Sequence, residues 1–338
     1  MRQIITIIWD SYRLLAAKKL FWVSLALSTL VALIYASIGF GPDGVSVLFG
    51  AYEWENETFN SQNPLMEYLY LLLFTNVVVP FWLGWFALLL ALISVCSVFP
   101  HFLQNGSIDV AISKPISRVT LFVTKYLSSL LVVVIQVLVF CLIVFLAIGL
   151  RLDSWNVTIF WAVPLIVFVF SLIFSVSVLM AVWTRSTMLS LLVALLVWGI
   201  SWGSQVSESL IYKAAYVVPA QGIEMDLGTG EAKQTREPKE VNADLARLHR
   251  VIKWVEAPLP KTRDAIYLLK KKITINGRNL TQTTGFMDSG ADDFDQSVSA
   301  ADEDYQNRHS EAYIIGTSLA FELVVISLAC FSFVRKDY

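Results

Sequence analysis

Apolar residues along this chain gather into six long runs, separated by short polar stretches and one long polar segment. The runs cover residues 20–40, 70–99, 119–150, 158–182, 188–212 and 312–334. An α-helix needs roughly 20 apolar residues to cross a bilayer, so each run is long enough. Pro80 and Pro164 lie inside two of the runs, where we expect them to kink the helix. The pattern predicts an all-α polytopic membrane protein with six transmembrane helices.

Basic residues in the short connections indicate which side each connection faces, because Lys and Arg are retained in the cytoplasm. They precede the first run, follow the second, join the fourth to the fifth and end the chain: Arg2, Arg13, Lys18, Lys19, Lys114, Arg118, Lys125, Arg185, Arg335 and Lys336. Residues 41–67 carry five acidic residues and no basic one. The alternation predicts that both termini are cytoplasmic.

The spans divide the chain into three parts. Residues 1–212 hold helices one to five and a polar segment at 100–118, residues 213–311 form an extracytoplasmic insert, and residues 312–338 hold helix six and the C-terminus. Residues 1–19 show an apolar stripe at helical spacing, which suits an interfacial helix at the inner membrane surface. A simple extension of the first span is the alternative.

The insert contains two amphipathic candidates, at residues 241–255 and 262–273, separated by Pro258 and Pro260. This predicts a helical insert that caps the outer side. The Asp-rich stretch 288–304 lacks the ligand spacing of a known calcium loop, so we interpret it as a solvated segment.

The composition limits which kinds of molecule the chain can be expected to bind. Hydrophobic residues make up 56% of the chain and charged residues 15%, so the lipid bilayer is the expected surroundings. The formal net charge of -2 provides no basic field for a nucleic acid. Neither a phosphate-binding G-x-x-x-x-G-K-S/T loop nor a hydrolase or metal-ligand motif is present, and His101, His249 and His309 lie in separate regions. We expect no catalytic residue, no metal site and no cofactor bound by this chain.

The segment 100–118 reads PHFLQNGSIDVAISKPISR and is a compact polar island between two apolar runs. Asn105 and Gly106 break the incoming helix, Ser107 can cap a new one, and Pro115 ends it. The island therefore predicts a helix of about two turns on the basic side of the membrane.

Ionisable residues inside a span cost about 2.5–3.5 kcal/mol on insertion scales, so they are treated as functional candidates. Glu322 lies near the middle of the last run, and Glu208 lies closer to the outer end of the fifth. A structural hydrogen bond and a place along a substrate route are both open for Glu322, and Glu208 can also reach toward the membrane surface.

Gly199 and Gly203 lie four residues apart in the fifth run, a spacing that lets two helix backbones approach closely. The contact can join two copies of the chain or two helices of one chain.

The run from Gly106 to Arg118, followed by Lys125 and Tyr126, resembles the G-S/T-I-D-x-x-x-S/A-K-P-I/V-S-R…K-Y signature of type-2 ABC exporter permeases. Within that family it is similar to the subgroup of multi-copper-enzyme maturation permeases. The opening D-S-Y-R with K-K-L-F-W, and the closing F-V-R-K-D, also resemble that subgroup.

The resemblance implies a half-transporter in a bacterial-type inner membrane that forms a homodimer or pairs with a paralogous permease. Two ABC ATPase subunits, which bind ATP and Mg, would dock in trans on the island as coupling helix. The residues carried over are Gly106, Ser107, Ile108, Asp109, Lys114, Pro115 and Arg118. Helices two and five would border the central cavity. Two departures are the absence of an acidic residue in 100–105 and the long insert.

Two alternatives belong to other classes. A secondary transporter should show repeated halves, broken helices and several buried charges, whereas this chain has one central charge and no evident repeat. A membrane anchor or sensor that presents the insert would need neither the island nor Glu322.

Overall fold

The computed structural model describes residues 9, 13, 16–17, 19–40, 44–48, 51–55, 64–104, 108, 116–152, 154–212, 220–225, 232–237, 243–275, 278–279 and 308–336. Within this part of the chain, six helices are long and apolar enough to cross a membrane. They are Lys19–Ser37, Tyr68–Phe102, Arg118–Leu150, Val157–Thr184, Thr187–Tyr212 and Glu311–Arg335. Each boundary lies within three residues of the predicted run, so the six-span polytopic fold is confirmed.

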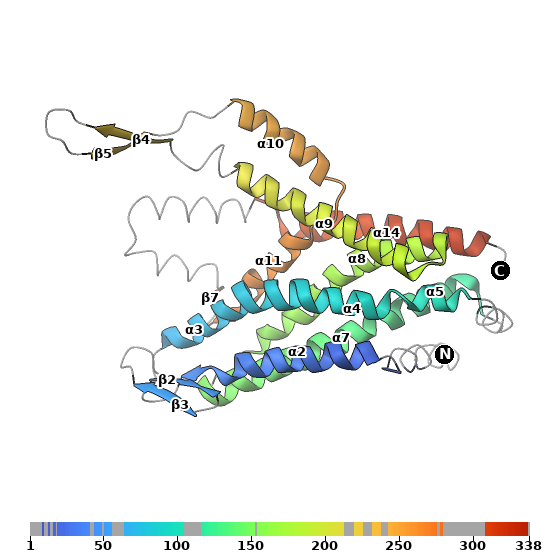
Figure 1. The fold of residues 1–338 in the computed structure, drawn as a ribbon, viewed down its shortest axis with the longest axis horizontal. Helices are drawn as coiled ribbons and strands as arrows, with labels where there is room; N and C mark the ends of the chain where they lie inside the picture. Colours follow the sequence, from blue (N-terminus) through green and yellow to red (C-terminus); the bar gives the residue numbers. More distant parts are fainter. Residues whose placement is uncertain are drawn as a thin grey trace.

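The spans form one elongated bundle (Figure 1). Its helices are α2 (Lys19–Ser37), α7 (Arg118–Leu152), α8 (Ala162–Thr184), α9 (Thr187–Tyr212) and α14 (Glu311–Arg335), with the second span built from α3 (Pro64–Leu73), η2 (Phe74–Ala87), α4 (Leu88–Val95) and α5 (Val98–Phe102). α8 is central: 78% of its apolar window is buried, against 22% for α9 and 28% for α14. A helix that is apolar all round belongs inside a bundle, whereas α9 and α14 leave one face to lipid or a partner.

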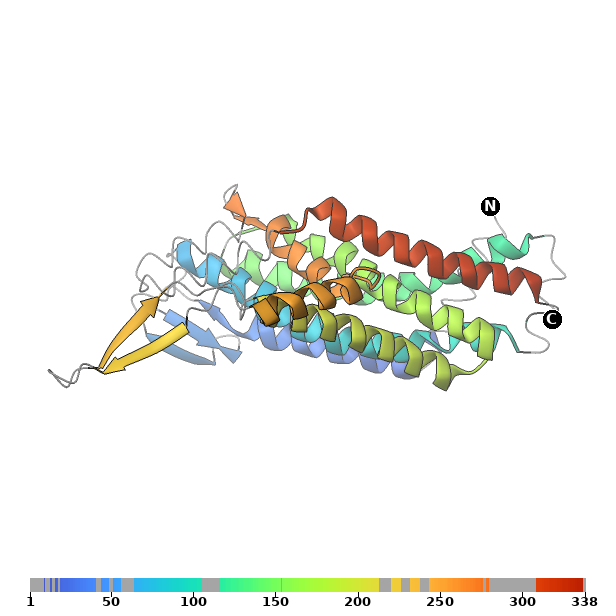
Figure 2. The ribbon, with the colours of Figure 1, turned by 90° about the horizontal axis from the view of Figure 1, so that it is seen from above.

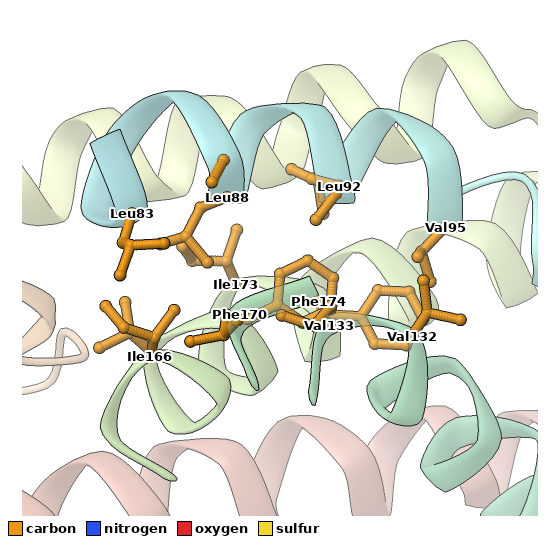
Figure 3. Close-up of a cluster of buried hydrophobic side chains, with 14 of the residues drawn as sticks. Leu83, Leu88, Leu92, Val95, Val132, Val133, Ile166, Phe170, Ile173 and Phe174 are labelled. Carbon is orange, nitrogen blue, oxygen red and sulfur yellow. The ribbon is translucent and has the colours of Figure 1, made fainter. Parts of the chain in front are cut away.

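The core lies where the second span crosses α8 and α7 (Figure 3). Its members are large apolar side chains with almost no exposed surface: Leu83, Leu88, Leu92, Val95, Val132, Val133, Ile166, Phe170, Ile173 and Phe174. Interdigitated side chains of this kind pack to crystal-like density, so a displacement of one helix is passed to its neighbours.

The two prolines behave differently. Pro80 lies inside η2, a stretch of π-helix, where the wider turn accommodates a residue that has no backbone N–H. Pro164 was wrongly expected to kink its helix. It lies in the first turn of α8, directly after the short 3₁₀ helix η3 (Val157–Trp161), where the missing N–H is not needed.

Strands occur outside the spans, which the sequence analysis missed. β1 (Gly39–Phe40), β2 (Gly44–Val47) and β3 (Tyr52–Glu55) form an antiparallel sheet in the order β1-β2-β3. In the insert, β4 (Ala220–Met225) pairs antiparallel with β5 (Ala232–Glu237), and β6 (Thr274–Ile275) pairs with β7 (Arg278–Asn279). The insert is therefore not purely helical.

The two predicted insert helices are present as α10 (Ala243–Glu256) and α11 (Thr262–Lys272). α10 runs beside α9, and α11 returns across the bundle (Figures 1 and 2). At the turn between them, the carbonyl of Pro260 accepts hydrogen bonds from Ser201 Oγ and from Gln205 Nε2, and the Lys261 N–H donates to Ser318 Oγ.

The insert is consequently more than an outer cap. Ser201 precedes Tyr212, the last residue of α9, by 11 residues, which corresponds to about 16 Å of helix. α11 packs against η2, α8, α9 and α14. The α10–α11 hairpin therefore re-enters the bundle between the spans, because its turn finds hydrogen-bonding side chains there.

Two interpretations fall largely outside the described residues. Of the interfacial helix at residues 1–19, the structure describes Trp9, Arg13 and Ala16 as helical, and the Ala17 N–H donates to the Arg13 carbonyl at 2.9 Å. The Asp-rich stretch 288–304 is not described.

Close packing of α11 on η2 depends on Gly84. A Cβ at this position would lie 2.9 Å from Ile266 Cδ1 and 3.3 Å from the Val79 carbonyl oxygen. We predict that Gly84→Leu displaces α11 and costs about 1–3 kcal/mol of stability through overpacking, measured as a lower thermal unfolding midpoint in detergent.

The matched control is Gly316→Leu, because a Cβ on Gly316 meets nothing within 4 Å among the described residues. Equal midpoints for the two variants would contradict the packing of α11 against η2.

Candidate functional site

α2 begins and α14 ends at the same end of the bundle (Figure 1), which is called the basic end. Lys19 begins α2, Arg118 begins α7, Arg185 follows α8 and Arg335 ends α14. Arg118 Nη1 donates to the carbonyls of Val334 at 2.9 Å and Lys336 at 3.1 Å, at the C-terminus of α14. A cation at this position satisfies carbonyls that have no helical partner. Arg118 therefore joins the start of α7 to the end of α14.

Lys336 continues this connection. Its Nζ donates to the carbonyls of Val182 at 2.6 Å and Trp183 at 3.2 Å, at the C-terminal end of α8. Burial, and then the nearby Arg185 charge, lower the pKa of Lys336. Three spans are thus tied together at the basic end by two cations.

Of the polar island, the structure describes residues 100–104, 108 and 116–118. Gly106, Ser107, Asp109, Lys114 and Pro115 lie outside the described residues. Ile108 is helical and almost completely buried, and its N–H donates to the Gln104 carbonyl at 3.5 Å. Ser117 caps α7, because its Oγ accepts from the Thr120 N–H at 3.1 Å.

Phenylalanines connect the edge of the island to the other spans. The Phe99 ring lies 5.3 Å from Phe122 and 6.3 Å from Phe174, measured between centroids. Phe333 lies 6.1 Å from Phe102 and 5.6 Å from Phe122. The end of the second span therefore packs directly on α7, α8 and α14.

Glu322 lies in α14 and is buried. The Tyr126 hydroxyl donates to Oε1 at 2.7 Å, and the Ser171 hydroxyl donates to Oε2 at 3.1 Å. The carboxyl group thus has hydrogen-bond partners on α7 and α8, which is the structural arrangement considered for this residue. Its place along a substrate route stays a prediction.

Glu208 points toward α10 and the residues before α14. It is buried, forms an ion pair with Arg308, and lies 2.8 Å from Nε2 of His249 on α10. These contacts hold α10 and the residues before α14 against α9. Its role in a substrate route also stays a prediction.

Further charges lie beside Glu208. Glu256 at the end of α10 is 3.8 Å from Lys261 Nζ, and both side chains are buried. Burial raises the pKa of Glu256, although Lys261 opposes this shift. Burial and the positive charges of Arg308 and Lys261 lower the pKa of His309 to about 4.

The glycines at 199 and 203 are open on their helix face. A Cβ added to either meets nothing within 4 Å among the described residues. The neighbouring tryptophans make the contact within the chain, since the Trp85 ring lies 4.8 Å from Trp198 and 4.9 Å from Trp202.

A cleft of about 220 Å³ lies between η2, α9 and α11. Its walls combine aromatic, polar and basic side chains: Thr75, Asn76, Pro80, Phe81, Gly84, Trp85, Trp198, Trp202, Thr262, Arg263, Ile266, Tyr267 and Lys270. An apolar groove of about 390 Å³ shares four of these residues and extends along η2 to Leu89. The second and fifth spans, which the resemblance places at the central cavity, line this cleft together.

Sequence reasoning missed the partners of Glu322 and Glu208. Tyr126 and Ser171 lie 196 and 151 residues from Glu322, and Arg308 lies 100 residues from Glu208. Tyr126 belongs to the K-Y pair of the resemblance, which was the only signal pointing to it. For Lys336 and the basic residues of α11, the sequence indicated a charge and nothing about their contacts.

Comparison with known families supports a transport role. Residues 17–338 match the model of a family described as ABC-2 family transporter protein. The match covers nearly the whole chain, including all six spans and the insert. No curated protein matches the sequence.

The hydrogen bonds of Glu322 generate a stability prediction. Glu322→Leu removes both acceptors and should cost about 1–3 kcal/mol, whereas Glu322→Gln retains an acceptor oxygen and should cost less. The midpoints of thermal unfolding in detergent rank the stability of the wild type, Glu322→Gln and Glu322→Leu.

Ser327→Leu is the control, because Ser327 is exposed on the same helix and its replacement should leave the midpoint unchanged. A Glu322→Leu midpoint equal to that of the wild type would show that these hydrogen bonds do not stabilise the bundle.

Proposed function

The chain belongs to the ABC-2 family of transporter proteins, and from that premise we propose that it is the permease subunit of an ATP-driven exporter with a separate ATPase. Family membership makes it a membrane component of an ABC transporter and favours transport over an anchor, a sensor or a secondary transporter. The chain lacks a phosphate-binding loop of the G-x-x-x-x-G-K-S/T type, which fits an ATPase supplied by a partner.

The observation that carries the coupling proposal is the packing at the basic end. The edges of the island contact α7, α8 and α14 through Phe99, Phe102 and Arg118. Because a packed core transmits a displacement, a push on the island would move three spans at once.

In this proposal the ATPase contacts are Gly106, Ser107, Asp109, Lys114 and Pro115. Ile108 and Arg118 serve mainly as anchors, since Ile108 is buried and Arg118 binds α14 carbonyls. The subgroup of multi-copper-enzyme maturation permeases is part of the proposal, as are cytoplasmic termini and an inner-membrane location.

Dimerisation is supported by α9. Gly199 and Gly203 face open space among the described residues, and Leu192, Leu196 and Ile200 beside them are exposed. A small-residue helix face of this kind lets a second backbone approach closely. We therefore place a second copy, or a paralogous permease, along α9.

The coupling proposal predicts that Asp109→Ala reduces copurification with the ABC ATPase subunit encoded beside the chain in its source genome. The expected loss is about tenfold, the effect of removing one charge-assisted contact. Affinity purification of the tagged permease, followed by quantification of the bound ATPase, measures it.

Arg185→Asn is the matched control. It removes a charge from the basic end but outside the island, and Asn tolerates the left-handed conformation that Arg185 adopts at φ 52°. An undiminished complex with Asp109→Ala, at equal expression, would contradict the island as the docking segment.

The dimer proposal predicts disulfide crosslinking of Gly199→Cys in a background in which Cys96, Cys141 and Cys330 are Ala. Leu30→Cys, on the exposed face of α2, is the control and should give no dimer band. Absence of a Gly199→Cys dimer in native membranes would contradict self-association through α9.

A further inference from the structure

The cleft between η2, α9 and α11 combines two chemistries. Its wall on α11 carries Arg263 and Lys270, and none of the described residues that line it is a carboxylate. The adjoining groove is lined by Pro80, Phe81, Phe86, Leu89 and two tryptophans, so its lining within the described part of the chain has no charged side chain. The positively charged cleft thus opens directly into the apolar groove.

The basic wall is built by one face of α11. Ile266, Tyr267 and Lys270 follow Arg263 by three, four and seven residues, so the four side chains share that face. Ile266 is the residue that packs on Gly84, and its contact fixes the face toward η2. The cations on either side of it are thereby presented to the cleft.

The two cations are held beside a common ring. The Arg263 guanidinium lies 5.4 Å and the Lys270 Nζ lies 4.8 Å from the centroid of Tyr267. Arg263 is also positioned through its backbone, because its N–H donates to Gln205 Oε1 at 2.9 Å. Burial raises the pKa of the neighbouring Asp264, and the positive charges of Arg308, Lys261 and Arg263 oppose this rise.

The apolar groove offers an alkyl chain a lining of aromatic and aliphatic side chains. From Pro80 to Leu89 it follows nine residues of the second span, which is about 13 Å of helix. Phe81 and Phe86 remain more than half exposed, so the groove is accessible from the side of the bundle. Trp85 and Trp202 form a rigid floor.

We propose that this cleft binds an anionic amphiphile of the bilayer, with its phosphate group between Arg263 and Lys270 and its hydrocarbon chain in the groove along η2. Charge complementarity selects the head group, since Arg and Lys are the side chains that bind phosphate. This inference rests on the proposed transport function, for which it names the substrate class.

Native mass spectrometry of the full chain tests the proposal with two probes, phosphatidic acid and phosphatidylcholine with identical acyl chains. Phosphatidic acid should bind about tenfold more tightly, because only its head group makes charge-assisted hydrogen bonds without a compensating cation. Arg263→Gln and Lys270→Gln should each abolish most of this preference.

Two further variants test the basic cleft and the apolar groove separately. Lys271→Gln removes a charge from the same helix but outside the cleft lining, so it should retain the preference. Phe81→Ala should weaken both lipids alike, since it shortens the groove and leaves the basic wall intact. Unchanged elution and circular dichroism confirm that each variant is folded.

Three outcomes overturn the proposal. Equal affinity for the two lipids would show that the head-group charge is not selected. Full competition by inorganic phosphate would show that the hydrocarbon chain of the lipid contributes nothing to binding. A dimer mass without bound lipid shows that a second copy fills the groove. The ATPase copurification assay is run on the same preparations. It distinguishes a failure of the proposed lipid substrate from a failure of the proposed permease function.

Loss of lipid preference with an intact ATPase complex overturns the substrate class alone. Selective lipid binding without any ATPase complex overturns the permease proposal and leaves the binding site in place.

Discussion

The structure depends on one constraint: backbone and side-chain polar groups at membrane depth need partners within the protein. The six spans meet it as helices, and the α10–α11 hairpin meets it through side chains of the spans. Ser201 and Gln205 satisfy the Pro260 carbonyl, and Ser318 accepts from the Lys261 N–H. Without these three side chains the turn would carry unsatisfied groups into an apolar bundle. The insert can therefore reach between the spans, because α9 and α14 supply polar residues at that level.

The same requirement explains the buried carboxylates. Glu322 receives hydrogen bonds from α7 and α8, and Glu208 is paired with Arg308 and His249. Each carboxylate consequently links elements that hydrophobic packing alone would leave free to slide. Leaving a buried charge without its partner is costly, so such pairs favour one arrangement of the helices over others. The Glu322 contacts lie among the three spans that are joined at the basic end.

Two regions of the bundle are suited to different tasks. At the basic end, Arg118 and Lys336 tie α7, α8 and α14 together. Away from that end, η2, α9 and α11 enclose a cleft with a basic wall and an apolar extension. The core of Phe170, Phe174 and their neighbours lies against both the second span and α7 (Figure 3). In the proposed function, these packed side chains would connect the ATPase contact at the island to the cleft.

The sequence alone determined the six spans to within three residues and the two insert helices, because run length and periodicity are local properties. It missed the described strands β1–β7, which are short segments with little apolar patterning. Only the tertiary structure decided that α11 enters the bundle, which partners Glu208 and Glu322 bind, and that Arg263 and Lys270 face the second span. These contacts join residues up to 196 positions apart, and a pairing of that range depends on how whole helices pack, which no local pattern encodes.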